Sequence, residues 1–168
     1  SSSGPRRKAR FAAMSVSIFA LGCHDDKHSR AYVGSPHEKL AKAERDGTRA
    51  KGTGVTCATC HMPGLAFTDG QPVSTGIYRL QGGRSAPTAI NRVYSKAQFW
   101  DGRADTLEDQ SVGPFVSPVE HGFLDHNELV SKIKSIEDYR MLFREVFGRE
   151  LTVGDVGRAI TAFQRTLL

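Results

Sequence analysis

The sequence predicts an all-α domain with long loops. Three segments in its last third carry apolar residues at the spacing of amphipathic helices, and each is preceded by a residue that can cap a helix. Residues 63–86 are instead rich in glycine, proline and serine and show no helical or strand period. No segment alternates cleanly enough to be a half-buried strand. A chain of 168 residues is long enough for one domain with a core and too short for two large ones.

The first 22 residues are typical of an export signal. A basic stretch, Arg6 to Arg10, precedes twelve mostly apolar residues from Phe11 to Gly22, which are too few to span a bilayer. Cys23 follows directly, and the ending Ala-Leu-Gly-Cys resembles the site at which bacterial lipoproteins are cleaved and lipidated. Cys23 is therefore either a lipid anchor or an incidental cysteine after an ordinary signal. Both alternatives predict a mature protein in the periplasm or the cell envelope.

The net charge of +5 resides in this signal segment. Four basic residues lie within the first ten positions, and no acidic residue precedes Asp25. Without residues 1–22 the chain has 19 basic and 18 acidic side chains, so it is almost neutral. We therefore expect no nucleic-acid partner, because such a surface needs a basic patch on the folded domain.

Residues 23–45 are interpreted as a polar tether and a short helix. Ser35 and Glu38 form a capping box with Pro36 at the first helical position, and the helix is expected to stop before Gly47. Residues 46–56 contain three glycines and lead as a loop into a cysteine motif. Residues 63–86 follow as a second, longer loop, and a loop of that length is usually functional. The domain proper is thus expected over residues 46–168.

The three predicted helices of the last third each begin with a capping residue and an acidic residue three positions later. The pairs are Asp125 and Glu128, Ser135 and Asp138, and Thr152 and Asp155. Gly148 is expected to end the second helix. The apolar positions of the three helices are expected to form the core; they are Leu129, Val130 and Ile133, then Tyr139, Leu142, Phe143, Val146 and Phe147, then Val156, Ile160, Phe163 and Leu167.

The motif Cys57-Ala58-Thr59-Cys60-His61 has the spacing of covalent c-type haem attachment. Two thiols three residues apart can reach the two vinyl groups on one edge of a porphyrin, and the next residue then lies under the iron. Zinc would need four ligands, but the only other cysteine is Cys23. A redox disulfide would need a strand–helix context, whereas a glycine-rich loop leads in here. We interpret the motif as one haem c, with His61 as the iron ligand, in a cytochrome c-like domain whose loops wrap it.

The sixth iron position separates an electron carrier from an enzyme. Carriers fill it with Met or His, whereas enzymes leave it open to substrate. Met62 is adjacent to the proximal ligand, Met14 belongs to the signal segment, and Met141 is expected on the solvent side of its helix. His121 and His126 are the remaining candidates. The absence of a convincing methionine favours an open site.

Several stretches resemble the N-terminal haem domain of the bacterial di-haem cytochrome c peroxidase and MauG family. They are CATCHMPGLAFTDG, GGRSAPTAINR, QFWDGRADTLEDQ, GPFVSPVEHGF and AITAFQRTLL, in the order and spacing of that family. The resemblance covers roughly residues 47–168. The haem motif alone is unspecific, whereas WDGRA followed by PVE is much more specific.

The resemblance implies roles for four residues beyond the Cys57–His61 motif, which would hold the peroxidatic haem. Glu120 matches the distal glutamate that moves protons during peroxide cleavage, and Gln110 and Pro114 match the distal glutamine and proline. Trp100 matches a tryptophan on the electron path between two haems. The alternatives from the residues themselves are a buried core aromatic for Trp100 and a solvated loop carboxylate for Glu120.

The chain also departs from the family. It carries one haem motif, whereas the family has two, so the second haem domain is not in this sequence. The last predicted helix reaches Leu168 without a C-cap, which suggests that more protein follows. Many of the peroxidases have a distal histidine in the 63–86 loop, where alignment places Ile77. The asparagine that often binds calcium is replaced by Ser85, which weakens the case for a calcium ion.

The leading hypothesis is a haem peroxidase domain that reduces hydrogen peroxide with electrons from a small cytochrome c or cupredoxin. Cleavage of peroxide requires a proton to move between its two oxygen atoms, and a carboxylate such as Glu120 can do both halves. The alternatives are a MauG-like oxidase of a protein side chain, a plain electron-transfer cytochrome, and an inactive fragment of a two-haem enzyme.

Overall fold

The computed structural model describes residues 55–168, and the predicted all-α class with long loops is confirmed. Within these residues the only strand-like features are three isolated β-bridges. In chain order the elements are α3 (Cys57–Cys60), the 3-10 turns η2 (Pro63–Leu65), η3 (Ile77–Arg79) and η4 (Arg92–Tyr94), and the helices α4 (Leu107–Val116), α5 (His126–Lys134), α6 (Glu137–Phe147) and α7 (Val153–Gln164). No helix of this part of the chain is long and apolar enough to cross a bilayer. The signal segment, Cys23 and the helix expected after Ser35 lie outside the described residues.

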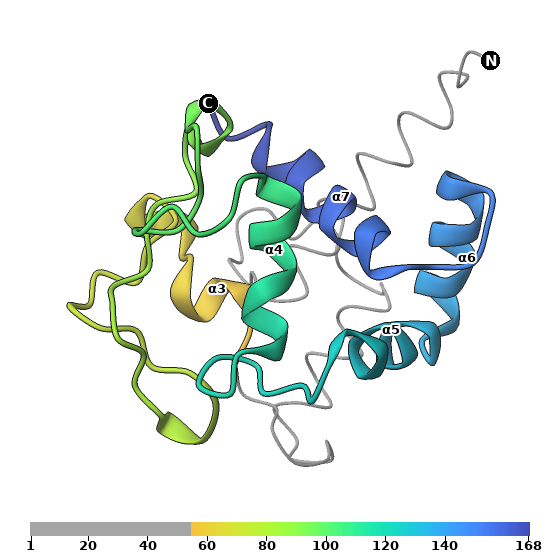
Figure 1. Ribbon diagram of the computed structural model, residues 1–168, viewed down its shortest axis with the longest axis horizontal. Helices are drawn as coiled ribbons and strands as arrows, with labels where there is room; N and C mark the ends of the chain where they lie inside the picture. The colour runs from red at the N-terminus through yellow and green to blue at the C-terminus, as the bar shows by residue number, and fades with distance from the viewer. Residues whose placement is uncertain (1–54) are drawn as a thin grey trace.

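Helix α4 occupies the middle of the molecule (Figure 1). The loops that carry α3 lie on one side of it, and α5 and α6 lie on the other. Helix α7 packs directly on α4, and the two backbones are so close that a Cβ atom on Gly157 would lie 2.9 Å from the Glu108 carbonyl oxygen. The Glu108 carboxylate then accepts hydrogen bonds from Thr161, at 2.9 Å, and from Arg165, at 2.8 Å. This crossing joins the helical half of the molecule, residues 107–168, to the loop half, residues 55–106.

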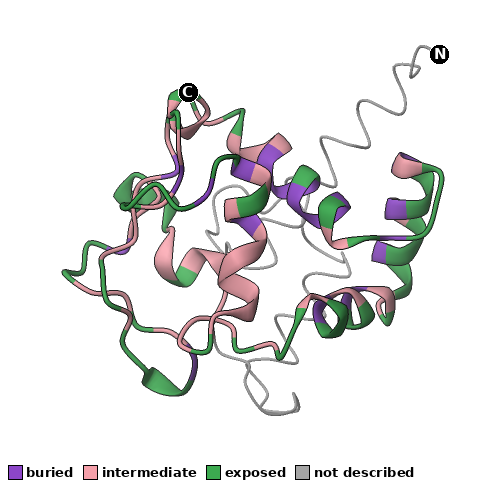
Figure 2. Ribbon diagram, in the orientation of Figure 1, coloured by how far each residue is buried: buried purple, intermediate pink, exposed green. Residues whose placement is uncertain are grey.

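The core lies among α5, α6 and α7, where the helical stripes predicted from the sequence meet. Figure 2 shows the buried faces of these helices turned toward one another. The buried residues are Leu129, Ile133, Tyr139, Phe143, Val146, Leu151, Val156, Ala159 and Ile160. Val130, Leu142, Phe147 and Phe163 are partly buried against them. Leu167 is also partly buried, and its carbonyl accepts a hydrogen bond from the Asn91 N–H at 2.8 Å.

The predicted starts of α5 and α7 and the predicted end of α6 are confirmed. The Asp125 carboxylate accepts the Glu128 N–H at 2.8 Å. Thr152 and Asp155 form the capping box of α7, and Gly148 ends α6 in the left-handed conformation with φ of +70°. Asp155 does more than cap: it is fully buried and is paired with Arg149 at 2.7 Å and Arg158 at 3.0 Å.

The predicted cap of α6 is wrong. Ser135 does not cap this helix; the N-cap residue is Ile136, which makes no side-chain hydrogen bond. Ser135 instead ends α5, where its N–H donates to the Ser131 carbonyl and its hydroxyl donates to the Lys132 carbonyl at 2.7 Å. The connection between the two helices is only two residues long, so finishing α5 uses the side chain that was expected to start α6.

Helix α4 was not predicted as an element. It carries a recognisable cap, because the Thr106 hydroxyl accepts the Asp109 N–H at 3.1 Å. Its interior holds Gly113 and Pro114, two poor helix formers, and its apolar side chains follow no clear stripe. Pro114 has no N–H to donate to the Gln110 carbonyl, so it removes one hydrogen bond from the helix. Tertiary packing on α7 therefore determines this helix more than its own propensity does.

Candidate functional site

Helix α3 presents both cysteines of the motif on one face. Thr56 stabilises its first turn by donating its N–H to the Thr59 hydroxyl at 3.0 Å. Residues three apart lie on the same side of a helix, so Cys57 and Cys60 are neighbours. His61 follows as the C-cap, and its N–H donates to the Cys57 carbonyl at 2.8 Å. Two thioether bonds and one iron–imidazole bond on a single porphyrin require this local arrangement.

The imidazole of His61 is oriented by the backbone of Phe67. The His61 Nδ1–H donates to the Phe67 carbonyl oxygen at 2.9 Å, which leaves Nε2 with a free lone pair for a metal. Phe67 and Ala66 both adopt the left-handed conformation, with φ of +58° and +53°, which turns this carbonyl back toward the histidine. Sequence reasoning missed Phe67, because the group that acts is a main-chain atom and two successive non-glycine residues rarely adopt this conformation.

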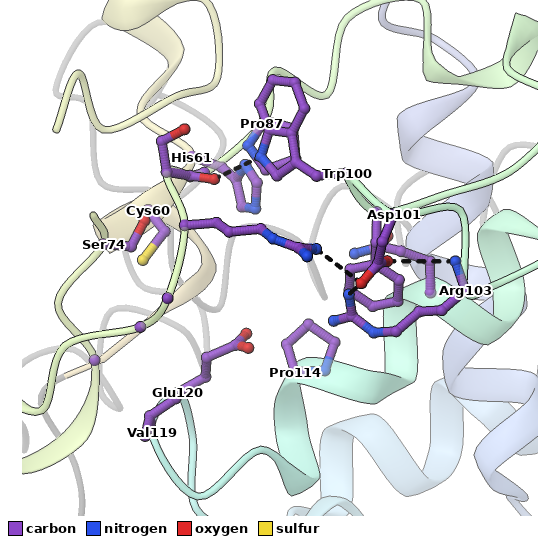
Figure 3. A pocket seen from close by; sticks show the side chains of 18 residues that line it. Cys60, His61, Ser74, Pro87, Trp100, Asp101, Arg103, Pro114, Val119 and Glu120 are labelled. Atoms are coloured by element: carbon purple, nitrogen blue, oxygen red, sulfur yellow. Dashed lines mark hydrogen bonds and ion pairs between the residues drawn. The ribbon is translucent and has the colours of Figure 1, made fainter. Parts of the chain in front are cut away.

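A cavity of about 560 Å³ brings the predicted site residues together. Helix α3 and its C-cap contribute Cys60 and His61 to its wall, while α4 contributes Gln110 and Pro114 and the loop after α4 contributes Glu120. Figure 3 shows Cys60, His61, Pro114 and Glu120 around the cavity. Cys57 lines a smaller adjoining cavity of about 80 Å³ together with Cys60, His61 and Glu120. A cavity of this size, next to two thiols and an imidazole with a free Nε2, fits a covalent porphyrin.

Glu120 belongs to a tight turn that directs its carboxylate toward the cavity (Figure 3). The Ser117 carbonyl accepts hydrogen bonds from the N–H groups of Glu120, at 3.1 Å, and Gly122, at 3.0 Å. Glu120 is half-buried, and within residues 55–168 its carboxylate accepts no hydrogen bond. A carboxylate held in this way is available to a small molecule in the cavity, so the alternative of a fully solvated loop carboxylate is not supported.

A second cavity, of about 440 Å³, also reaches Glu120. It shares Phe99, Arg103, Pro114 and Glu120 with the first cavity, but neither α3 cysteine nor His61 lines it. Its remaining wall is polar and small, formed by Ala104, Asp105, Asp109, Gly113 and Ser117. Glu120 therefore lines all three cavities.

Charged residues that the sequence did not single out line the large cavity near Trp100. The Asp101 carboxylate pairs with Arg84 at 2.8 Å and with Arg103 at 2.9 Å. The Arg84 hydrogen bond is the main reason that the pKa of Asp101 falls to about 2. The Arg103 guanidinium also stacks on the Phe99 ring, 3.6 Å from its centroid. Two arginines at a cavity wall can hold the carboxylates of a bound cofactor.

Trp100 lines the same cavity but is not a core residue. Its side chain is exposed, with 62% of its surface accessible, and its Nε1–H donates to the Ser85 carbonyl at 2.9 Å. The alternative of a buried core aromatic is therefore wrong. The Ser85 carbonyl thus fixes the orientation of the Trp100 ring.

The two rival interpretations of the cysteine motif find no support in the geometry. Within the described residues, no cluster of three or more histidine, cysteine and acidic side chains could hold a metal ion. Burial raises the pKa of the Cys57 thiol to about 11 and also raises the pKa of Cys60. Redox-active cysteine pairs need a lowered pKa, so these thiols are poorly suited to disulfide exchange.

The candidate sixth ligands differ in their surroundings. Met141 is 55% exposed on α6, as predicted, so it faces solvent. The His126 Nε2–H donates to the Val112 carbonyl at 3.1 Å. His121 lines the small cavity and packs on Phe115, with ring centroids 5.0 Å apart. Burial lowers the pKa of His121 to about 4, so its imidazole is neutral at pH 7. Ile77 is buried and lines none of the three cavities.

A family model and individual relatives place this chain in the same protein family. The family model described as "Di-haem cytochrome c peroxidase" matches residues 45–168. The methylamine utilization protein MauG of Methylophilus methylotrophus is 37% identical over 124 residues, which are 73% of this chain and 37% of that protein. The cytochrome c551 peroxidase of Pseudomonas aeruginosa is 36% identical over 118 residues, covering 68% of this chain and 34% of that protein. The chain thus spans about a third of the length of these relatives.

Solved structures agree with the fold. A MauG-like protein associated with microbial copper homeostasis superimposes with a TM-score of 0.60 at 30% identity, covering 67% of this chain and 35% of that chain. The diheme peroxidase BthA from Burkholderia thailandensis superimposes with a TM-score of 0.65 at 23% identity, covering 98% of this chain and 39% of that chain. The second likeness concerns the fold alone.

Proposed function

Since this chain belongs to the di-haem cytochrome c peroxidase family, we propose that it is the peroxide-cleaving haem domain of a peroxidase. The observation that carries the proposal is the convergence of Cys60, His61 and Glu120 on one cavity. In this proposal Cys57 and Cys60 bind one haem c covalently and His61 Nε2 ligates its iron. When bound, the haem would supply the electron pair that breaks the O–O bond of hydrogen peroxide.

Glu120 would act as the acid and base of the reaction. Its carboxylate takes the proton from the peroxide oxygen nearer the haem and returns it to the far oxygen, so that water leaves instead of hydroxide. General acid–base help of this kind contributes roughly 100- to 10,000-fold. The position of Glu120 in the walls of all three cavities supports this role. The second cavity offers hydrogen peroxide an approach that does not pass His61.

Gln110 and Pro114 would shape the same side of the cavity. Gln110 can orient a bound oxygen atom by hydrogen bonding, because an amide both donates and accepts. Pro114 has no N–H and lines all three cavities, so it restricts their width without adding a polar group. Trp100, exposed at the cavity wall, is proposed to pass electrons in from a second haem domain or a donor.

The proposed partners and location follow from this chemistry. Electrons would come from a small cytochrome c or cupredoxin, by way of the second haem domain that the family carries. Covalent haem attachment in bacteria takes place outside the cytoplasm, and residues 1–22 are typical of an export signal. We therefore place the protein in the periplasm or cell envelope, with Cys23 as a candidate lipid anchor. The case for a calcium ion is weak, because the resemblance places Ser85 where the family often has an asparagine ligand.

A second candidate function is oxidation of a protein side chain, as in the MauG proteins. The observation that favours it is Trp100, whose exposed ring at the cavity wall could pass electrons from a docked protein to the site. A carrier function would instead need His121 to bind the iron.

Rapid mixing of haem-loaded ferric protein with hydrogen peroxide tests the proposal. The haem absorption band should change at a rate proportional to peroxide concentration and far above that of free haem. A reduced small cytochrome c should then be oxidised if the peroxidase function is right, whereas the MauG-like function requires a protein product instead. A resting spectrum that is purely low-spin, with no peroxide reaction, would support the electron-carrier alternative.

A further inference from the structure

The backbone of Glu120 is held by the loop around Gly76 and Ile77, which comes earlier in the sequence. The Ile77 N–H donates to the Glu120 carbonyl oxygen at 3.0 Å, although 43 positions separate the two residues. A Cβ atom added to Gly76 would lie 1.9 Å from the Val119 carbonyl oxygen and 2.9 Å from the Glu120 Cα. No side chain can occupy that space. Glycine at position 76 therefore allows the two segments to touch.

The side chain of Ile77 extends the same contact to the other end of the Glu120 turn. It is 5% exposed, and its Cδ1 lies 3.2 Å from the position that a Cβ on Gly122 would take. Gly122 has a φ of +72°, a conformation that other residues adopt only under strain. Ile77 thus packs on the backbone after Glu120, while Gly76 packs on the backbone before it.

The loop that provides this contact is itself braced. The Gly76 N–H donates to the Leu80 carbonyl at 2.8 Å, and the Leu80 N–H returns a bond to the Ile77 carbonyl at 3.0 Å. An isolated bridge pairs Thr75 with Gln81 just outside this turn. The tip residue Tyr78 is exposed and left-handed, with φ of +54°. The turn is closed by its own hydrogen bonds, so it can act as a fixed support.

We propose that Gly76 and Ile77 are positioning residues for Glu120: Gly76 lines the large cavity but has no side chain to present to it, Ile77 lines none of the three cavities, and together they fix the backbone from which the Glu120 carboxylate enters the cavity. This inference rests on the proposed function of Glu120. Ile77, which alignment places where related peroxidases have a distal histidine, has a different task here, because its side chain faces Gly122 and not the cavity. A misplacement of about 1 Å at a catalytic group can cost on the order of 100-fold in rate.

The test compares two Gly→Ala variants of the haem-loaded protein. Gly76→Ala should slow the peroxide-dependent change in haem absorption by roughly 10- to 100-fold, because the new methyl group displaces the Glu120 turn. Gly64→Ala is the matched control, since a Cβ there meets nothing within 4 Å and the residue lines no cavity. Hydrogen exchange of the segment containing the Ile77 amide should rise in Gly76→Ala only, because its bond to Glu120 is lost.

A double-mutant cycle distinguishes positioning from general damage. If Gly76 acts through Glu120, Gly76→Ala should slow the reaction in the wild-type background and have little further effect in a Glu120→Gln background. If Gly76→Ala fails to take up haem, Ile77→Val, which removes one methylene from the contact, is measured in the same two backgrounds. Equal rates for Gly76→Ala and Gly64→Ala, or equal slowing in both backgrounds, would overturn the inference. A Glu120→Gln variant that reacts like wild type overturns the proposed function instead.

Discussion

At the scale of single residues, the site depends on main-chain atoms that direct side chains. The Phe67 carbonyl selects the His61 tautomer that leaves Nε2 free, and the Ser117 carbonyl gathers the N–H groups of the Glu120 turn. The motif residues could be predicted from sequence because haem attachment fixes their spacing locally. Phe67 and Gly76 could not, because their partners are backbone atoms whose positions only the tertiary structure sets.

The buried His121 should make the protein's stability sensitive to mild acid. Burial lowers its pKa to about 4 in the folded state, against about 6.5 in an unfolded chain. Between pH 6.5 and pH 4 the unfolded state binds a proton at His121 and the folded state does not. The contribution of neutral His121 to the free energy of unfolding is therefore complete above pH 6.5 and decreases as the pH falls to about 4. The shift corresponds to roughly 3 kcal/mol at most.

Urea unfolding measured between pH 7 and pH 4 checks this. His121→Phe keeps an aromatic ring against Phe115 and removes the titration, so the free energy of unfolding should fall less with acid than in wild type. Parallel curves for the two proteins would show that His121 does not carry the effect.

At the scale of elements, local capping signals determine where some helices begin, and tertiary packing determines others. The starts of α5 and α7 could be predicted, because Asp125 and Thr152 satisfy backbone N–H groups within their own turn. The start of α6 could not, because Ser135 is used by the preceding helix. Helix α4 lacks an apolar stripe, and its stability comes from packing on α7 around Gly157. That crossing also aims Gln110 and Pro114 at the cavity.

Two Gly→Ala variants in α7 test how close the α4–α7 crossing is. Gly157→Ala places a methyl group 2.9 Å from the Glu108 carbonyl oxygen, so it should lower the free energy of unfolding by about 1–3 kcal/mol. Gly154→Ala, on the exposed side of the same helix, should stabilise by up to about 1 kcal/mol through helix propensity. Thermal or urea unfolding measures both. A neutral or stabilising Gly157→Ala would contradict the close packing.

At the scale of the whole molecule, the helical half supports a loop half that forms most of the cavity wall. The core among α5, α6 and α7 reaches the small cavity through Ile160, while the loops between α3 and α4 supply residues 82–87 and Trp100 to the wall of the large cavity. The helical core follows from periodicity, so the sequence predicts it well. The loop half follows no period, and its placement around the cavity came only from the family resemblance.

Covalent haem is the expectation on which this architecture depends. Protein exported with a c-type haem maturation system should keep its haem after denaturation, and its pyridine haemochrome spectrum should indicate two thioether bonds. A Cys57→Ala, Cys60→Ala double variant should lose covalent haem. Haem that extracts freely into acidified acetone, or an unchanged yield in the double variant, would be inconsistent with the site described here.

The central claim is that Glu120 moves the peroxide proton, and one rapid-mixing measurement tests it most directly. Glu120→Gln keeps the shape of the side chain but cannot accept and return a proton. Haem content and the resting spectrum should stay nearly unchanged, while the peroxide-dependent change in haem absorption should slow by roughly 100-fold or more, about 2.7 kcal/mol of activation free energy. Trp100→Phe is the matched control, because it should react with peroxide at the wild-type rate and lose only later electron delivery. Equal peroxide rates in wild type and Glu120→Gln would contradict the account.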